Sequence, residues 1–545
     1  MGMFLRLWIA GLLFFIAFAF AGAEPWAFSV VQAGVLMALS VWLCSRRIFI
    51  ATPLLKIVLG TLGFLIFFCA LQASFPTTLL AAVPWFPASL MPLFTWEHAS
   101  LFITYAAVVA VVSQLADCSN ALKQFALAVG LCGLAVALCA LCLPDGEYIR
   151  LLVGIRGGMG PFFNRNHAGI FLAMCAVVSL GYGVASFLDY ARFAAEHRKN
   201  QFFWRQVFFA VMFISLVLGV VFTRSRGGML AVLTGIFGYT FLCVSLVPYR
   251  WKTRLKGLLI TFTVFLLCSG WILTHTQQIN AFAHRTSGTS EETRKMLYRA
   301  GWTLLKERPV WGIGVGALPV AITPYMEWQL PSYVERLHCD WLELLLGLGW
   351  GGFLPLAGGV LWFGVMALAR LKKLRTRKKF LFASVLSALL VMGVGCLVDF
   401  DLFIPATGIL FFLIIGMACS ASYDKEHLQG YSLSPVCLGG ILLLALSSCY
   451  VPLQKTIAWR LHLFGRGLLP QRQVQIYAQA LQHYPAPRYA LYLGNAYIKQ
   501  SLQTQEPLER AALRAQANRV AVSYLTKYPK EKGLSRLYLS TLAQK

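Results

Sequence analysis

Three ionisable residues, His338, Asp340 and Glu343, stand together in RLHCDWLELLLGLGWGG, residues 336–352, where the chain becomes almost purely apolar. Charge at membrane depth is costly, so such a group is a candidate functional site. The short acidic neighbour Asp340 could fix the tautomer of the His338 ring and raise its basicity, as a general base requires. The alternatives are a structural histidine at a helix mouth and a metal site, but a metal would need a further well-spaced ligand. Glu343, three residues after Asp340, is either a second acid or a structural partner.

Four hydrogen-bonding residues follow one another in GMGPFFNRNHAGIF, residues 158–171, namely Asn164, Arg165, Asn166 and His167. The glycines and the proline break helical order, so these four residues lie at the mouth of the next apolar segment. An asparagine there could serve only as a helix cap. Four polar residues are more than a cap needs, so we expect Arg165 and Asn166 to bind substrate, together with Arg156 shortly before them.

Two arginines, Arg224 and Arg226, share the short turn FTRSRGGML, residues 222–230. Glycine permits close approach of the backbone to a ligand, and guanidinium groups bind phosphate oxygens in a bidentate manner. A snorkelling side chain would account for one arginine, but not obviously for both. The turn is therefore a candidate phosphate-binding site.

A further arginine, Arg294, lies in a longer connection, where residues 291–306 are expected to form a helix. Tyr298 and Trp302 follow it on one face, so this helix could lie along the membrane surface with its aromatic rings at the headgroup level. An interfacial position alone is a strong alternative explanation for its basic residues. The GIGVGA run at 312–317 lacks the preceding strand and the GK[ST] of a nucleotide loop.

The composition indicates that these residues are positioned by helices that cross a membrane. Of the 545 residues, 58% are hydrophobic and only 12% are charged, too few for the surface of a soluble protein of this size. We predict an all-α polytopic membrane protein with 12–13 transmembrane helices, the first being an uncleaved stretch that resembles a signal peptide. The segments lie near 4–22, 28–45, 54–72, 99–116, 122–143, 167–188, 204–222, 228–248, 256–274, 341–369, 380–399, 402–421 and 434–452.

Basic residues predict the orientation. The net charge of +26 is concentrated in alternate short connections, such as RLKKLRTRKK at 370–379. By the positive-inside rule these connections are cytoplasmic, so the candidate residues above and the long loop 275–340 lie on the outer side. Lysine and arginine also suit contact with anionic membrane lipids, whereas no nucleic-acid-binding module is present. The fourteen cysteines are scattered, mostly inside apolar segments, and indicate neither a disulfide framework nor a zinc site.

The last part of the chain, residues 453–545, is expected to be a soluble α-helical domain that follows a transmembrane domain of residues 1–452. YAQALQHYP (477–485) and AVSYLTKYP (521–529) resemble the ends of tetratricopeptide helices, and LGNAY (493–497) fits part of that repeat. We predict a degenerate tetratricopeptide-like tail that docks a partner protein or a glycan. With thirteen spans the tail lies outside the cytoplasm, and with twelve it lies inside.

Four motifs in this order resemble the O-antigen ligase-like superfamily, which includes O-antigen ligases, O-antigen polymerases and protein O-oligosaccharyltransferases. They are N-R-N-H after a Gly-Pro-Phe turn, S-R-G between spans, R…W…P-x-x-G-x-G, and H-x-D-W-L-E, within about residues 155–355. The resemblance implies an inner-membrane glycosyltransferase whose donor is a glycan on undecaprenyl diphosphate. It places Arg226 and Arg294 on the diphosphate and His338 at the family's essential histidine. The sequence departs from the family in having Asp340 after Cys339, and Gly347 where a glutamate is frequent.

The chemistry of the residues agrees with this resemblance. Arg226 and Arg294, helped by Arg224 and Arg165, would neutralise the diphosphate leaving group, so no cofactor or metal is required. His338 would activate an acceptor hydroxyl on a second lipid-linked repeat, on lipid A-core or on a protein, and direct displacement would invert the anomeric centre. The tail mildly favours a polymerase or a protein-glycosylating member. The alternative is a flippase or another transporter, but the polar residues gather on one face rather than at mid-membrane.

Overall fold

The structure is a computed structural model of the 545-residue chain. It describes residues 1–46, 48–75, 86–116, 118–144, 146–153, 158–192, 199–246, 251–274, 291–325, 334–374, 376–423, 430–526 and 532–542. Arg156 and much of the predicted catalytic loop 275–340 lie outside these residues.

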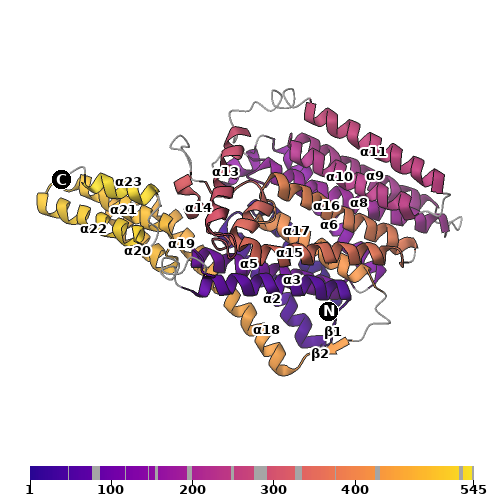
Figure 1. Ribbon diagram of the computed structural model, residues 1–545, viewed down its shortest axis with the longest axis horizontal. Coiled ribbons are helices and arrows are strands. Elements are labelled where there is room, and N and C mark those ends of the chain that lie inside the picture. The colour runs from indigo at the N-terminus through magenta and orange to yellow at the C-terminus, as the bar shows by residue number, and fades with distance from the viewer. Residues whose placement is uncertain are drawn as a thin grey trace.

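Helices make up nearly all of the described chain (Figure 1). The larger part contains α1 (Gly2–Phe18), α2 (Pro25–Arg46), α3 (Pro53–Ser74), α5 (Pro92–Leu115), α6 (Ser119–Cys142), α7 (Glu147–Val153), α8 (Arg165–Arg192), α9 (Lys199–Phe222), α10 (Arg226–Leu246), α11 (Trp251–Thr274), α13 (Glu291–Glu307), α14 (Leu318–Ala321), α15 (Asp340–Leu371), α16 (Thr376–Val398), α17 (Pro405–Ala421) and α18 (Pro435–Ser448). The tail contains α19 (Tyr450–Gly465), α20 (Pro470–His483), α21 (Pro487–Gln503), α22 (Pro507–Leu525) and α23 (Lys532–Leu542). Two 3-10 turns, η1 (Phe20–Gly22) and η3 (Thr323–Tyr325), and one antiparallel pair of strands, β1 (Ile48–Ile50) and β2 (Gly430–Ser432), complete the described elements.

Within the described residues, eleven helical segments are long and apolar enough to cross a membrane. Two shorter apolar helices, α1 and α17, coincide with the predicted segments 4–22 and 402–421. The prediction of an all-α polytopic membrane protein is therefore confirmed, apart from one short pair of strands, while the count of thirteen spans stays a prediction. The helix expected at 291–306 is present as α13.

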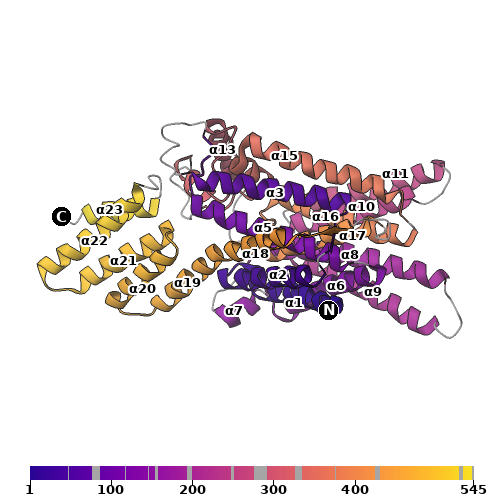
Figure 2. The same cartoon turned by 90° about the horizontal axis from the view of Figure 1, so that it is seen from below.

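The spanning helices run side by side in one bundle with α5 near its centre (Figures 1 and 2). In the apolar stretch of α5, 89% of the residues are buried inside the protein, whereas in that of α11 only 11% are buried. Helix α11 therefore forms an outer edge of the bundle. Buried polar side chains tie α5 to α2, because the Gln32 amide donates to Ser100 Oγ at 2.7 Å and to Thr104 Oγ1 at 3.0 Å. Such bonds satisfy polar groups that would otherwise be costly inside the bundle.

The GIGVG stretch is joined to α15 by backbone hydrogen bonds. Helix α15 is broken at Gly349 (φ 61°, ψ −177°), which leaves carbonyl groups before the break free to accept. Ile313 N donates to Leu346 O and Gly314 N donates to Gly347 O, both at 3.0 Å. A Cβ on Gly312, whose φ is +70°, would lie 2.4 Å from Leu346 O. The glycines thus serve close packing of backbone on backbone, in agreement with the rejection of a nucleotide loop.

We expect Gly312→Ala to destabilise the protein by at least about 1–3 kcal/mol, because it adds a steric clash to an unfavourable φ. The measurement is the thermal midpoint of unfolding of the purified protein. Gly358→Ala in α15 is the control, since a Cβ there meets nothing within 4 Å. Equal midpoints for the two variants would contradict this account of the glycine.

The tail lies at one end of the bundle and is anchored there through α19 (Figures 1 and 2). Thr456 Oγ1 is 2.9 Å from Ser29 Oγ, and Lys455 Nζ donates to Glu97 at 2.8 Å. The boundary predicted at residue 452 therefore falls inside a helix that packs on the membrane part, while α20–α23 extend away from it. The likeness of these helices to tetratricopeptide repeats remains a prediction.

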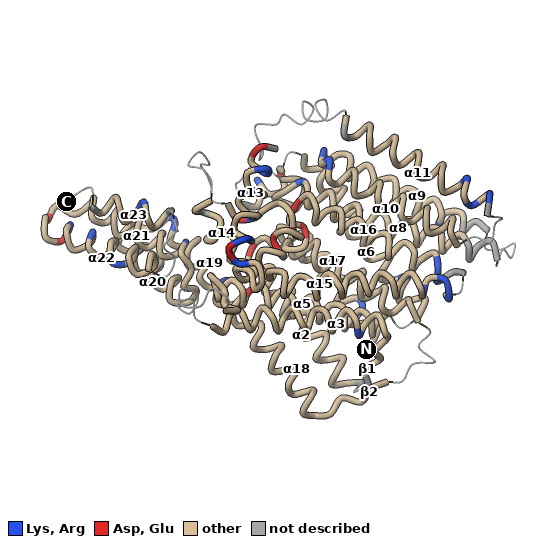
Figure 3. Tube along the Cα trace, in the orientation of Figure 1, with Lys and Arg blue, Asp and Glu red and all other residues tan. Residues whose placement is uncertain are grey.

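Charge is distributed unevenly along the bundle (Figure 3). Acidic residues gather at the end that carries α13 and the tail, whereas basic residues of α11 and of the connection from α15 to α16 lie at the other end. The positive-inside rule concerns only the basic residues, and it would place the short connection from α15 to α16 in the cytoplasm and the tail end on the other side.

Candidate functional site

The candidate site is centred on His338, which lies on an extended segment just before α15. Its Nδ1 lies 2.8 Å from Oδ1 of Asp399, and the side chain of His338 is 20% exposed whereas that of Asp399 is 2% exposed. A carboxylate accepts from Nδ1–H, which leaves Nε2 as the basic nitrogen. Among the described residues Nε2 has no hydrogen-bond partner, so the ring is arranged as a general base would be.

The Asp399 carboxylate is held by more than one donor. Asn166 Nδ2 donates to its Oδ2 at 2.7 Å, and the backbone N–H of Phe400 donates to Oδ1 at 3.1 Å. Burial alone would raise the pKa of Asp399, but hydrogen bonds from His338 and Asn166 and the neighbouring ring of His167 lower that pKa to about 2. The carboxylate therefore stays ionised over the whole physiological range.

A second histidine–aspartate pair lies beside the first. His167 Nδ1 is 2.7 Å from Oδ1 of Asp401, and both side chains are almost fully buried. The ring of Phe400 separates the two pairs, with its centroid 4.6 Å from that of His167 and 5.2 Å from that of His338. Burial raises the pKa of Asp401 despite the bond from His167, so the two carboxyl groups differ in acidity.

Asp340 does not occupy the position predicted for it. Its Oδ2 accepts from the backbone N–H of Leu402 at 2.8 Å, and its own N–H donates to the Asp399 carbonyl at 3.3 Å. The side chain is fully buried in the first turn of α15 and points into the fold. The expectation that Asp340 orients His338 is therefore wrong in its geometry. Asp399 does so, because a helix-opening residue directs its side chain away from the ring two positions earlier.

Glu343, whose role was left open, anchors the segment that carries the histidine. Its carboxylate accepts from Arg336 Nη1 at 2.6 Å and from the backbone N–H of Leu337 at 3.1 Å. The guanidinium of Arg336 also lies 4.5 Å from the ring centroid of Phe403. Glu343 is thus a structural partner, consistent with its nearly complete burial.

The backbone at His338 is itself constrained. Its φ is +57°, a left-handed conformation that a residue other than glycine adopts at a cost. Tyr298 Oη on α13 donates to the His338 carbonyl at 3.0 Å, which helps to hold this conformation. Arg294 lies one turn before Tyr298 on α13, and its buried Nε has no hydrogen-bond partner among the described residues. Arg294 therefore lies near His338, and its Nε–H could donate a hydrogen bond to a ligand.

Helix α8 begins at the site with Arg165 and Asn166. The Asn164 side chain accepts from the N–H of Asn166 at 2.9 Å, as a helix cap does. Arg165 lies close enough to Arg224 for their positive charges to repel each other. Two guanidinium groups placed beside a helix N-terminus form a strongly electropositive region, which favours an anion.

Helix α10 begins at the same place with Arg226. Ser225 Oγ caps it by accepting from Gly228 N at 3.1 Å. A Cβ on Gly227 would lie 2.9 Å from Val398, the residue immediately before Asp399. Arg224 has a left-handed backbone, with φ +53°. The turn thus packs directly against the segment that holds the His338 partner.

A comparison with protein families agrees with this geometry. Residues 210–357 match a family model described as O-antigen ligase, and this range includes Arg224, Arg226, Arg294 and His338. This stretch of the chain is similar to the O-antigen ligase family. No curated protein matches the sequence. The match supports a glycosyltransferase family of the O-antigen ligase or polymerase type and gives no support to the flippase alternative.

Sequence reasoning missed Asp399 and Asp401, which lie outside the range similar to O-antigen ligases. A signal was present, because CLVDFDLF at 396–403 places two acids at the outer end of an apolar segment. Among the predicted ligands, the structure brings Arg165, Asn166, Arg224, Arg226 and Arg294 to the end of the bundle that carries His338. Within the described part of the chain, no group of three or more His, Cys, Asp or Glu side chains could hold a metal ion.

The depressed pKa of Asp399 predicts how stability changes with pH. A carboxylate whose pKa is about 2 when folded and about 3.9 when unfolded contributes on the order of 2–3 kcal/mol above pH ~4, and this is lost as the pH falls through ~2. We expect Asp399→Asn to lower the thermal midpoint at pH ~5 and above, with the gap to wild type narrowing below pH ~4. Glu147→Gln is the control, because the Glu147 side chain is partly exposed and pairs only with Arg150 among described residues. A gap that persists unchanged down to pH ~2 would contradict the assignment.

Proposed function

We propose that the chain is a bacterial inner-membrane glycosyltransferase that transfers or polymerises a glycan from undecaprenyl diphosphate on the periplasmic face. The observation that carries this proposal is the His338–Asp399 pair, whose Nε2 has no hydrogen-bond partner among the described residues, near four arginines at or beside the starts of α8, α10 and α13. The family match supports the reaction class.

The arginines would serve the donor. A diphosphate leaves readily once its developing charge is neutralised, and guanidinium groups with two helix N-termini can do this without reorganisation. Arg226 opens α10, Arg165 opens α8 beside Arg224, and Arg294 offers a buried Nε–H. We assign the diphosphate to this region, with Asn166 positioning Asp399 rather than touching the donor.

His338 would serve the acceptor. Its Nε2 takes the proton of an acceptor hydroxyl as that oxygen forms a bond to the anomeric carbon. The bond from the anomeric carbon to the diphosphate oxygen breaks, and the lipid diphosphate leaves with the electron pair. Asp399 stabilises the imidazolium that results, in the way a buried carboxylate supports a catalytic histidine. A single displacement of this kind inverts the anomeric configuration.

The test uses the purified chain in nanodiscs with lipid-linked glycan extracted from the producing cells, without nucleotide. We expect new glycosidic products in a mass spectrum, either a ladder from a polymerase or a single addition to lipid A-core or protein from a ligase. His338→Ala should lower the rate at least about 100-fold, because general base catalysis is removed. Arg299→Ala, an exposed arginine on α13, is the control and should retain the rate. Full transfer by His338→Ala, or glycolipid movement without a new bond, would overturn the proposal.

Substitutions of the two acids near His338 should have different effects, one on kcat and the other on folding. Asp399→Asn is expected to lower kcat at least about 10-fold with little change in KM, because the ring loses the group that fixes its tautomer. Asp340→Asn should reduce the yield of folded protein while the folded fraction keeps its kcat, because Asp340 holds the Leu402 backbone. A larger fall in kcat for Asp340→Asn than for Asp399→Asn would restore Asp340 as the orienting residue.

A further inference from the structure

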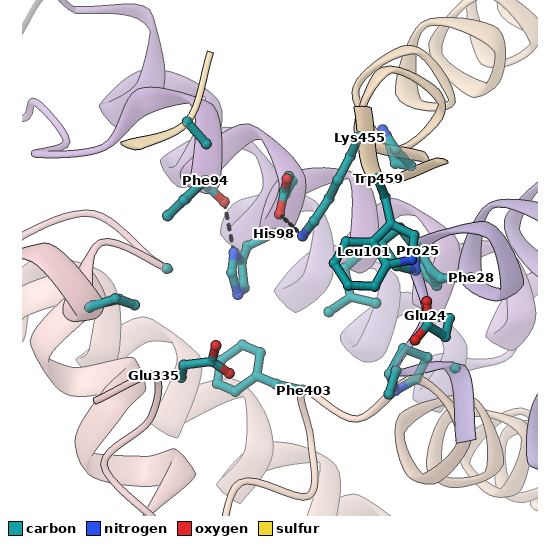
Figure 4. A pocket seen from close by; sticks show the side chains of 18 of the residues that line it. Glu24, Pro25, Phe28, Phe94, His98, Leu101, Glu335, Phe403, Lys455 and Trp459 are labelled. Atoms are coloured by element: carbon teal, nitrogen blue, oxygen red, sulfur yellow. Dashed lines mark hydrogen bonds and ion pairs between the residues drawn. The ribbon is translucent and has the colours of Figure 1, made fainter. Parts of the chain in front are cut away.

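A cavity of about 480 Å³ lies between the tail and the membrane part, at the end of the bundle that carries His338 (Figure 4). Its wall is built from the start of α2, the start of α5, the segment before α15, the connection from α16 to α17, and the tail. The volume falls within the range of roughly 300–1,000 Å³ that small-molecule sites occupy. The tail contributes Trp459 from α19 and Tyr489 from α21, so the cavity exists only because the tail is anchored there.

Polar groups with unused hydrogen-bonding capacity face this cavity. His98 Nδ1 lies 2.7 Å from the Phe94 carbonyl, which can only accept, so the proton is on Nδ1 and Nε2 is an acceptor. Figure 4 shows the ring of His98 directed into the hollow from α5. The buried indole N–H of Trp459 has no hydrogen bond of ordinary geometry among the described residues and lies beside Glu24. Burial raises the pKa of Glu24. A hydrogen-bond acceptor on His98, a donor on Trp459 and the carboxyl group of Glu24 thus all lie at this cavity.

The charge of the cavity does not suit a diphosphate. Its three basic side chains already pair with carboxylates, Arg336 with Glu343, Lys455 with Glu97 and Arg488 with Glu335. Glu24 is a further acid, so the wall has no surplus of positive charge. A neutral ligand rich in hydroxyl groups fits better, because hydroxyls both donate and accept.

Aromatic rings supply the remaining surface. Trp459 and Phe403 stand on opposite sides of the hollow, and Phe28 lies beside Trp459 (Figure 4). Flat aromatic faces pack well against the C–H faces of a pyranose ring, while its hydroxyls reach the polar groups at the edge. The wall therefore combines the two kinds of contact that a sugar needs.

The cavity reaches the immediate neighbours of the proposed catalytic pair. Phe400 lines it, and the ring of Phe400 contacts the ring of His338. Arg336, two residues before His338, also forms part of the wall. The arginines assigned to the donor lie elsewhere, at the starts of α8, α10 and α13. We propose that this cavity binds the terminal sugar of a carbohydrate acceptor and presents its hydroxyl to His338, an inference that rests on the proposed function.

Binding can be tested without turnover. The probe is the oligosaccharide released by mild acid from the cells' own lipid-linked glycan, added to the full-length protein in nanodiscs and followed by saturation-transfer NMR. We expect binding to wild type, an approximately tenfold weaker Kd for Trp459→Ala, and a smaller loss for Trp459→Phe, which keeps the ring but not the N–H. Phe464→Ala, an exposed aromatic on the same helix, should bind as wild type does. Absence of binding to wild type, or equal binding by Trp459→Ala, would overturn the proposal.

Transfer kinetics separate this proposal from the one it rests on. Trp459→Ala and Glu24→Gln should raise the KM for the acceptor about tenfold while leaving the KM for the donor unchanged, and Arg294→Ala should do the reverse. Retained binding of farnesyl diphosphate by the cavity variants would show that they are folded. If wild type transfers glycan but these variants have an unchanged acceptor KM, or if only a serine- or threonine-containing peptide is glycosylated, the cavity is not the acceptor site. If wild type transfers nothing, the proposed function fails, and the binding measurement alone decides the cavity.

Discussion

The buried carboxylate of Asp399 is the constraint on which the site depends. It must be ionised to hold His338, and an ionised group with 2% of its side chain exposed is stable only where donors surround it. These donors come from His338, Asn166 and the backbone of Phe400, so three separate parts of the chain have to meet at one point. The starts of α8 and α15 and the end of α16 are thereby fixed relative to one another.

The helical membrane fold and most of the site could be predicted from the sequence. The length of an apolar segment, and the arginines and His338 near the ends of such segments, can be recognised from short stretches of sequence alone. Arg165, Arg224, Arg226 and Arg294 could be singled out because they lie where the positive-inside rule predicts few basic residues. The partner of His338 could not be found in this way. Asp340 is close in sequence, but the first turn of α15 directs it to Leu402, while Asp399 is brought in by the packing of α16.

The arrangement separates two tasks by charge. The region of Arg165 and Arg224 is electropositive and suits a phosphate, whereas the cavity beside Trp459 has its cations paired and suits a neutral ligand. His338 lies where the two regions meet. Because the tail forms one wall of the cavity, it belongs to the same functional unit as the membrane part.

The break of α15 at Gly349 affects the free-energy cost of placing Asp340 and Glu343 near a membrane. At 1.5 Å per residue, the 32 residues of α15 extend about 48 Å, well beyond a hydrocarbon layer of about 30 Å. Residues 350–371 alone extend roughly 33 Å, which is enough to cross that layer. The turns before Gly349, with Asp340 and Glu343, then project into the depth of the lipid headgroups. There Glu343 pairs with Arg336 and Asp340 accepts from the Leu402 backbone, so protein groups rather than lipid surround both acids.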